Sequence, residues 1–372
     1  MARESITTRL IEAIEGWDPL HGPLVWSDEL FDELARAVFA HQYKHNAAYR
    51  GYCESSGVRP ESLNTWRDLP AVPTDAFKYV RLSAAEQPVR TFRTSGTSAD
   101  ARGEHHFGTL DVYKAALHGP FVRFCLPEQR PIRMLVVAPS PDDLADSSLS
   151  FMLGELVARW GDAESGYFFG PGQSGAFEPD FEGLGRALDR AQADDVVTMV
   201  LGTAFGFIEF FDHNAGRWSL PAGSRVMETG GFKGRTRELT RAELYGLFEQ
   251  RLGISTAMCV SEYSMTELSS QAYSDNLASG IQENVRLRVP PWARVEVVDP
   301  VSLRPLKGGT QRGLIRWIDL ANVDSVCAVQ TSDMGIVDED GGFLLLGRAA
   351  EAELRGCSLT IEEIIAASTD KR

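Results

Sequence analysis

Hydrophobic and polar positions follow two patterns along the chain, one typical of helices and one typical of buried strands. Leu30, Leu34 and Val38 recur every four residues behind a Ser-Asp-Glu start, so residues 1–60 are expected to be helical. Between residues 61 and 290, continuous apolar runs alternate with helical patterns. Such runs are typical of strands buried on both faces, which indicates largely parallel sheets.

This alternation predicts an α/β protein. The expected strands of its body are 133–138, 196–201, 225–228 and 257–260. The expected helices are 110–124, 147–160, 181–192 and 240–252. After the body, short strands lie between turns rich in glycine, proline and aspartate. We therefore predict four segments, which are a helical N-terminal segment (1–60), an α/β body (61–290), a small β-rich subdomain (291–347) and a short C-terminal tail (348–372).

Composition and charge narrow the class of protein. The 372 residues include 37 Lys and Arg against 52 Asp and Glu, a net charge of −15. This charge argues against general nucleic-acid binding and against docking on anionic lipid, although a local site can still hold a nucleotide. No run approaches the roughly 20 apolar residues of a membrane span. The five cysteines are scattered and odd in number, and no signal peptide is evident, so we expect a cytoplasmic protein with free thiols.

A cluster of hydroxyl-bearing residues surrounds one glycine early in the body. Glycine lets backbone N–H groups approach a ligand, and hydroxyls donate to oxyanions, so the cluster is a candidate phosphate loop. Taken alone, it is more typical of an ordinary turn. Its residues are Thr94, Ser95, Gly96, Thr97 and Ser98.

A second glycine-rich run, residues 170–175, formally matches Gly-x-Gly-x-x-Gly after a strand-like segment. A dinucleotide-binding fingerprint must open directly into a helix. Here Pro179 delays the next helix, so we expect a loop and no NAD site.

Four further motifs follow the phosphate-loop candidate in a fixed order along the chain. They are residues 228–234 (Glu-Thr-Gly-Gly-Phe-Lys-Gly), 262–267 (Glu-Tyr-Ser-Met-Thr-Glu), 331–335 (Thr-Ser-Asp-Met-Gly) and Gly347-Arg348 with the later Arg-Gly-Cys-Ser-Leu. In this order the five motifs resemble the adenylate-forming superfamily of acyl-CoA synthetases. Within it the chain most resembles the acyl-protein synthetases of the LuxE type, over roughly residues 65–365.

The resemblance implies a fold, a reaction and cofactors. The fold would be the N-terminal body of an adenylate-forming enzyme, with parallel-rich sheets and flanking helices, a small β-rich subdomain and a truncated C-terminal tail. The reaction would join a carboxylic acid to ATP with the help of Mg²⁺, giving an acyl-adenylate, and would then pass the acyl group to a nucleophile. Fatty, aromatic and amino acids all remain open as substrates, with Phe77, Phe205 and Phe207 as candidate pocket residues.

The resemblance also implies roles for the phosphate and adenine motifs. The loop from Thr94 to Ser98 would surround the β- and γ-phosphates, with Arg102 as the nearest cation where relatives have a lysine. The two glycines of the second motif, Gly230 and Gly231, would pass beside the adenine. His105 and His106, just after the loop, either contact the ligand or begin a strand.

The third motif would complete the nucleotide site. Tyr263 would stack on adenine, Thr266 would touch the α-phosphate and Glu267 would help hold Mg²⁺. Without the neighbouring motifs, the same residues are also consistent with a surface helix start. Asp333 and Arg348 would bind the ribose, although a turn aspartate and a surface arginine are common.

The C-terminal motif carries the candidate nucleophile. Relatives with a full C-terminal domain use a lysine there, whereas the sole lysine after Arg348 is Lys371, so Lys233 or Arg102 would have to compensate. By resemblance, Cys357 would accept the acyl group. A thiolate attacks activated acyl groups well, and the nearby Arg355 is expected to lower the pKa of the thiol. The alternative is a buried structural cysteine, the role expected of the other four.

We therefore expect an ATP-dependent acyl-activating enzyme that forms a thioester on Cys357. A partner protein such as an acyl reductase or carrier would then receive the acyl group. One alternative is a ligase that uses coenzyme A or an amine, with Cys357 uninvolved. Another is a non-catalytic nucleotide-binding subunit.

Overall fold

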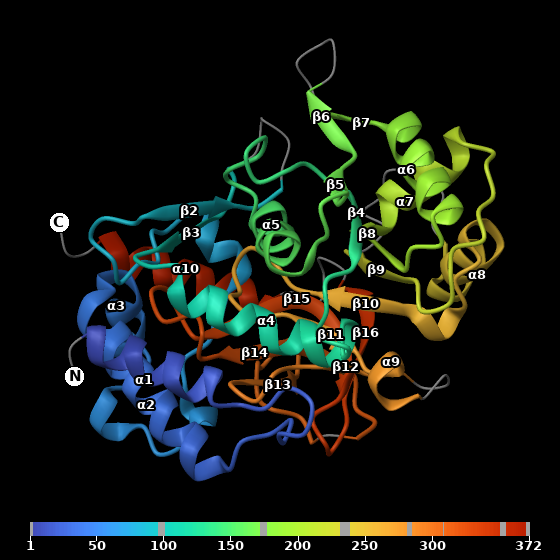
Figure 1. The fold of residues 1–372 in the computed structure, drawn as a ribbon. Helices are drawn as coiled ribbons and strands as arrows, with labels where there is room; N and C mark the ends of the chain where they lie inside the picture. Colours follow the sequence, from blue (N-terminus) through green and yellow to red (C-terminus); the bar gives the residue numbers. More distant parts are fainter. Residues whose placement is uncertain are drawn as a thin grey trace. The chain divides into compact units, whose positions relative to one another are not determined.

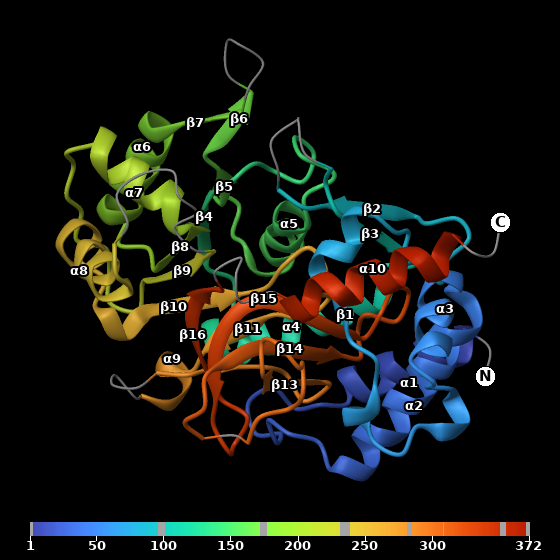
Figure 2. The same cartoon turned by 180° about the vertical axis from the view of Figure 1, so that it is seen from behind.

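The computed structural model describes residues 3–95, 101–171, 177–230, 239–280, 285–307, 309–349 and 355–369. The chain forms two compact units, which Figures 1 and 2 show from opposite sides. The first unit comprises residues 1–120, 265–272 and 288–372, and the second comprises 121–264 and 273–287.

The second unit is built on five parallel strands, which confirms the parallel arrangement predicted from the apolar runs. Their order is β5-β4-β8-β9-β10. The strands are β4 (Arg133–Val137), β5 (Gly166–Tyr167), β8 (Thr198–Thr203), β9 (Arg225–Thr229) and β10 (Cys259–Tyr263). β4 and β9 are buried along their whole length, as expected of strands covered on both faces.

Helices cover these strands. They are α5 (Ser148–Trp160), α6 (Phe181–Ala193), α7 (Ala204–His213), α8 (Arg241–Leu252) and the short α9 (Asn276–Ser279), with a 3-10 turn η4 (Thr256–Met258). Apolar residues of α6, α7 and α8 form one core cluster with residues of β4, β8 and β9. Local signals fix the helix limits, since Thr240 and Glu243 form a capping box and Gly253 ends α8 at φ 70°.

Of the glycine-rich run, only Gly170 and Pro171 are described, and they lie in β6 (Phe169–Pro171), which pairs antiparallel with β7 (Phe177–Pro179). Residues 172–176 lie outside the described residues. The next helix, α6, begins only at Phe181. Among the described residues, the next helix therefore begins only after Pro179, as the position of this proline predicted.

The first unit contains the short strands predicted after residue 290. They form an antiparallel sheet in the order β13-β14-β15-β16, and β1 (Val72–Pro73) adds to β15 in parallel. The strands are β13 (Ala293–Val298), β14 (Gly313–Asp319), β15 (Ala328–Val337) and β16 (Phe343–Arg348). A separate hairpin pairs β2 (Arg90–Arg93) with β3 (Glu104–Phe107).

Helices of the first unit come from both ends of the chain. They are α1 (Arg3–Glu15), α2 (Asp28–His45), α3 (Ala47–Ser55) and α10 (Arg355–Thr369), with 3-10 turns η1 (Pro60–Ser62), η2 (Trp66–Asp68) and η3 (Thr74–Lys78). α10 packs against α3, β1 and η3, and Figure 2 shows it in red beside α3. The chain passes from one unit to the other within α4 (Asp111–Cys125), between Ser264 and Met265, within β11 (Ala272–Ser274) and within β12 (Leu287–Arg288).

A buried polar network fixes residues 265–272 within the first unit. The carboxylate of Asp319 accepts the backbone N–H groups of Ser269 at 2.9 Å and Ser270 at 2.8 Å, and also the Ser270 hydroxyl at 2.7 Å. Asn322 accepts the Ser269 hydroxyl and donates its amide to the carbonyl of Glu267 at 2.7 Å. Buried polar groups are costly unless paired, so this network specifies one path for the segment.

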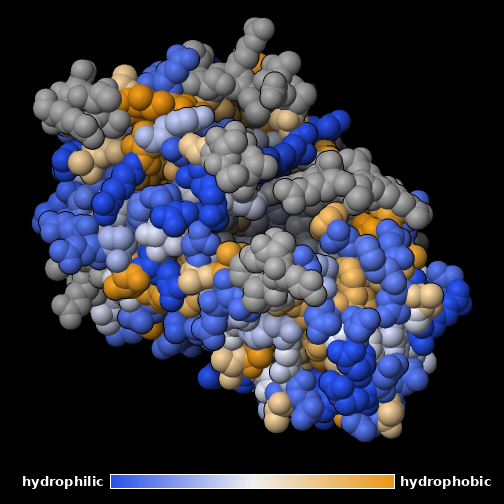
Figure 3. Space-filling model, turned by 90° about the horizontal axis from the view of Figure 1, so that it is seen from above, coloured by the Kyte–Doolittle hydropathy of each residue, from blue (hydrophilic) through white to orange (hydrophobic). Residues whose placement is uncertain are grey.

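Within the described residues, the exposed large hydrophobic side chains are Val25, Leu30, Tyr79, Val89, Val301 and Leu346. Figure 3 shows one face on which hydrophilic residues predominate and hydrophobic ones form small patches. Within the described ranges, no helix has the length and apolar character needed to cross a bilayer.

We predict that replacing Asp319 with alanine lowers the free energy of unfolding by about 3 kcal/mol or more, because several buried N–H groups lose their acceptor. Urea denaturation followed by tryptophan fluorescence would measure the loss. Glu339→Ala, at an exposed turn of the same unit, should stay within about 0.5 kcal/mol of the native protein. A loss below about 1 kcal/mol for Asp319→Ala would show that the network is not needed for stability.

Candidate functional site

The stem of the candidate phosphate loop is closed by hydrogen bonds between β2 and β3. Thr94 donates its N–H to the carbonyl of Gly103 at 2.9 Å and accepts the Gly103 N–H on its hydroxyl at 2.8 Å. Arg102 donates to the carbonyls of Thr94, at 2.7 Å, and of Arg93, at 3.3 Å. Arg102 therefore braces the loop stem.

Three of the five predicted loop residues, Gly96, Thr97 and Ser98, lie outside the described residues. The described part of the loop contains Thr94 and Ser95, and Ser95 is exposed.

His105 joins the loop stem to the Thr-Glu motif. It lies in β3 and is buried, so its position is that of a strand residue, one of the two alternatives for this histidine. Its Nδ1 donates to the carbonyl of Thr266 at 2.7 Å. Burial lowers the pKa of His105 to about 4, so the ring is neutral at physiological pH. A neutral ring with one donor nitrogen suits this fixed contact.

Thr266 and Glu267 lie in a turn and not at the start of a helix, so the surface-helix alternative is wrong. Glu267 is 8% exposed. His105 holds the carbonyl of Thr266 and Asn322 holds that of Glu267. Hydrogen bonds to both carbonyls therefore fix the backbone of the turn that carries Thr266 and Glu267.

The two candidate ribose residues lie opposite each other. Asp333 in β15 is paired in register with Arg348 in β16, and Nε of Arg348 is 3.7 Å from Oδ1 of Asp333. The Arg348 side chain is 70% exposed, against 15% for Asp333. An ion pair of this length with one exposed partner contributes little to stability.

Within the second unit, the predicted nucleotide residues Gly230 and Tyr263 follow or end neighbouring parallel strands. Gly230 has φ 77°, the left-handed region that favours glycine. Ligands commonly bind at the carboxyl ends of parallel strands. Gly231 and Lys233, predicted to belong to the same region, lie outside the described residues.

A buried carboxylate next to Tyr263 was not singled out from the sequence. Thr229 in β9 and Glu262 in β10 are register partners, and the Thr229 hydroxyl donates to the Glu262 carboxylate. Burial raises the pKa of Glu262 to about 7, although the hydroxyls of Ser264 and Thr229 lower it. The available signal was a glutamate at the end of an apolar run, where perturbed carboxylates often mark functional sites.

Cys357 lies in the first turn of α10 and is 6% exposed. It packs in a small apolar cluster with Val298, Leu314 and Met334. Burial raises the pKa of the thiol to about 11, and the carboxylate of Asp75 adds to the rise while Arg316 opposes it.

The expectation of a lowered thiol pKa is therefore wrong. It rested on a basic residue nearby in the sequence, Arg355, whereas the net shift is set by burial. At rest, Cys357 is a protonated thiol.

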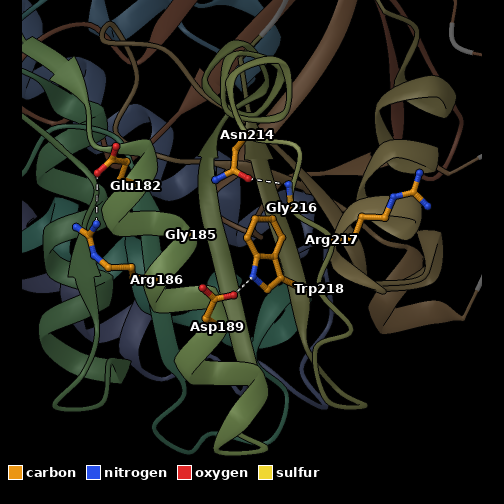
Figure 4. Close-up of a pocket in the computed structure, with 8 residues that line it drawn as sticks. All are labelled: Glu182, Gly185, Arg186, Asp189, Asn214, Gly216, Arg217 and Trp218. Carbon is orange, nitrogen blue, oxygen red and sulfur yellow. Dashed lines mark hydrogen bonds and ion pairs between the residues drawn. The ribbon is translucent and has the colours of Figure 1, made fainter.

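A pocket of about 360 Å³ opens on the second unit but contains none of the predicted site residues. Figure 4 shows Arg186 pointing toward Glu182 and Trp218 donating to Asp189 at 2.8 Å, whereas Arg217 points away from both pairs. A Cβ on Gly216 would come within 2.6 Å of the Trp218 ring, so the glycine makes room for the indole. The pocket is explained by this packing.

The candidate pocket residue Phe207 is also structural. It is buried in the core of the second unit, with its ring 5.0 Å from that of Phe248 in an edge-to-face contact.

Comparison with known proteins identifies the family to which the chain belongs. The family profile described as acyl-protein synthetase, LuxE, matches residues 11–103 and 186–366. A long-chain-fatty-acid–luciferin-component ligase of Vibrio harveyi is 23% identical over 370 residues, covering 94% of this chain and 92% of that protein. The ligase of the same name from Aliivibrio fischeri is 24% identical over 331 residues, covering 85% and 82%.

Solved structures show the same fold. A 2-hydroxyisobutyryl-CoA ligase in complex with 2-HIB-AMP and CoA aligns with a TM-score of 0.62 at 16% identity, covering 87% of this chain and 68% of that chain. The predicted α/β fold of an adenylate-forming enzyme is confirmed.

We predict that Glu262→Gln is more stable than the native protein at high pH. Burial raises the pKa of Glu262 from its ordinary value of 4.5, which applies to the unfolded chain, to about 7 in the folded protein. The protonated acid therefore stabilises the fold fully below pH 4.5, and this contribution is lost as the pH rises through 7. The glutamine stays neutral, so the variant should gain about 3 kcal/mol relative to the native protein by pH 8.

Urea denaturation of both proteins from pH 4 to 8 would measure this difference, with the exposed Glu339→Gln as control. A difference that does not change with pH would contradict the raised pKa.

Proposed function

Because the chain belongs to the acyl-protein synthetase, LuxE, family, we propose that it activates a carboxylic acid with ATP and holds the acyl group on Cys357 as a thioester. The observation that carries this proposal is the extent of the family match. Its two segments, 11–103 and 186–366, include every predicted site residue. The relatives' names point to a long-chain fatty acid as the substrate.

In the first step, a carboxylate oxygen of the acid attacks the α-phosphorus of ATP. An O–P bond forms, the bond between the α-phosphorus and the bridging oxygen breaks, and pyrophosphate leaves. We assign Thr94 to Ser98 to the β- and γ-phosphates and the Thr266 hydroxyl to the α-phosphate. Hydroxyl and backbone donors stabilise charge that develops on phosphate oxygens.

The residues present are suited to Mg²⁺. Glu267 is a buried carboxylate in a fixed turn, and Mg²⁺ prefers one or two carboxylates together with substrate phosphates. When bound, the ion would neutralise charge on the phosphates and orient them. Glu267 would hold it from the protein side.

The remaining candidates would bind the nucleoside. We assign Asp333 and Arg348 to the ribose hydroxyls, which is consistent with their pairing across two strands. Tyr263 would stack on the adenine, with Gly230 and Gly231 passing beside it.

In the second step, the Cys357 sulfur attacks the acyl carbonyl. A C–S bond forms, the acyl C–O bond to phosphate breaks, and AMP leaves. With a thiol pKa of about 11, only roughly one molecule in ten thousand carries a thiolate at pH 7. The thiol proton must therefore pass to a base or to water during transfer. The thioester would then deliver the acyl group to an acceptor such as an acyl reductase or carrier protein.

The burial of Cys357 also supports a second function, in which coenzyme A or an amine accepts the acyl group and the cysteine is structural. A buried, protonated thiol is the usual state of a structural cysteine. The two functions differ in whether the protein itself becomes acylated.

We predict a hydroxylamine-labile acyl mass on the native protein after incubation with ATP, Mg²⁺ and a long-chain fatty acid. Cys357→Ser should lose this mass but keep acid-dependent exchange of pyrophosphate into ATP, because adenylation precedes transfer. Cys53→Ala, a change at another buried cysteine, should keep both. Intact-mass spectrometry and the exchange assay measure the two steps separately.

Exchange without an adduct on any protein, and with turnover that depends on coenzyme A or an amine, would establish the second function. The absence of exchange with every acid tested would contradict both.

A further inference from the structure

One short helix, η3 (Thr74–Lys78), contacts three candidate functional parts of the first unit. The first is the stem of the phosphate loop. A Cβ on Gly103 would lie only 3.3 Å from Cβ of Phe77, so the stem packs directly on η3. The Phe77 ring also meets the His105 ring edge-on, with centroids 6.0 Å apart.

The second part is the turn that carries Thr266 and Glu267. His105, which lies against Phe77, donates to the carbonyl of Thr266. The hydrogen bond to Asp75 raises the pKa of Lys78, and the carboxylate of Glu267 adds to the shift. The ammonium of Lys78 thus lies within electrostatic reach of the proposed Mg²⁺ ligand.

The third part is α10, which carries Cys357. α10 packs against η3, and the carboxylate of Asp75 acts on the Cys357 thiol. Asp75 and Lys78 form an ion pair at 2.6 Å. One pair of charges therefore acts electrostatically on both the proposed metal ligand and the proposed nucleophile.

Stability does not account for this ion pair. The side chains of Lys78 and Asp75 are 37% and 45% exposed, and exposed pairs contribute about 0–1 kcal/mol. A lysine ammonium is a compact charge on a flexible stem with three rotatable donors. Such a group can move from a carboxylate to a phosphate over a short distance.

Two arginines near the candidate residues of this unit, Arg102 and Arg348, are less suited to donating to a phosphate. The guanidinium of Arg102 is bonded to the backbone carbonyls of the loop stem. Arg348 faces Asp333 across the two strands assigned to the ribose. Adenylation places extra negative charge on the α-phosphate, and a cation that donates to its oxygens lowers the barrier.

We propose that Lys78 is the catalytic cation of the adenylation step, with Asp75 as the residue that positions its ammonium. This inference rests on the proposed function. As the acid's carboxylate forms its bond to the α-phosphorus and pyrophosphate departs, the ammonium donates to the α-phosphate oxygens. No proton is transferred in this step, so Lys78 remains charged throughout.

The test separates the two half-reactions. Adenylation is followed by pyrophosphate exchange at saturating ATP and fatty acid, and transfer by acylation of the protein from chemically prepared acyl-adenylate. Lys78→Met should slow exchange about 100-fold, the effect typical of one lost charge-stabilising donor. The KM for ATP and the rate of transfer should each change by less than about 3-fold, because the lost contact forms in the transition state of adenylation.

Three further variants make the result specific. Lys78→Arg should recover at least about a tenth of the lost exchange rate, since it restores a positive charge. Asp75→Asn, which keeps the ammonium but removes its partner, should slow exchange about 10-fold without changing the KM for ATP. Lys44→Met, at an exposed lysine of α2, should match the native protein.

Exchange by Lys78→Met within about 3-fold of the native rate would overturn the proposal. An equal loss in exchange and in transfer would also overturn it, because that pattern indicates a structural role. If Lys78→Met does not fold, the other two variants decide the question. Native-like exchange by Asp75→Asn, together with equal slowing of both half-reactions by Lys78→Arg, would overturn the proposal. The absence of exchange in the native protein itself would instead refute the proposed function on which the inference rests.

Discussion

The candidate chemistry of the first unit depends on one buried polar network. Asp319 and Asn322 bind the backbone and hydroxyls of Ser269 and Ser270, and Asn322 also holds the carbonyl of Glu267. A segment rich in serine has little apolar surface to bury, so hydrogen bonds must determine its path. Because the network is buried, few alternative arrangements can satisfy the same donors, and the turn before it has a defined position.

Around this fixed turn, the first unit brings together parts that are far apart in the sequence. His105 links the loop stem to Thr266, and η3 packs against the stem and against α10. The same compactness buries Cys357 and keeps its thiol protonated. Burial protects a thiol from side reactions but makes it a poor nucleophile at rest. A chain that forms a thioester at this position must therefore remove the thiol proton only when an activated acyl group is present.

The fold was more predictable from the sequence than the site. Continuous apolar runs predicted the parallel strands of the second unit, and capping residues such as Thr240 marked helix starts, because both signals are local. The register that pairs Thr229 with Glu262 is set by strands separated in the sequence, so their buried hydrogen bond could not be predicted. The error at Cys357 has the same origin, since its pKa follows from apolar neighbours contributed by β13, β14 and β15. The roles of Tyr263, Thr266 and Glu267 rest on resemblance and stay predictions.

The central claim is that this chain activates an acid and captures it on its own cysteine. Counting the AMP released per chain during incubation with ATP, Mg²⁺ and a long-chain fatty acid, with no acyl acceptor added, tests that claim most directly. We predict a rapid burst of one AMP per chain, followed by a much slower phase, and no burst from Cys357→Ser. Continuous release at a constant rate that is the same in both proteins would show that the acyl group leaves without passing through Cys357.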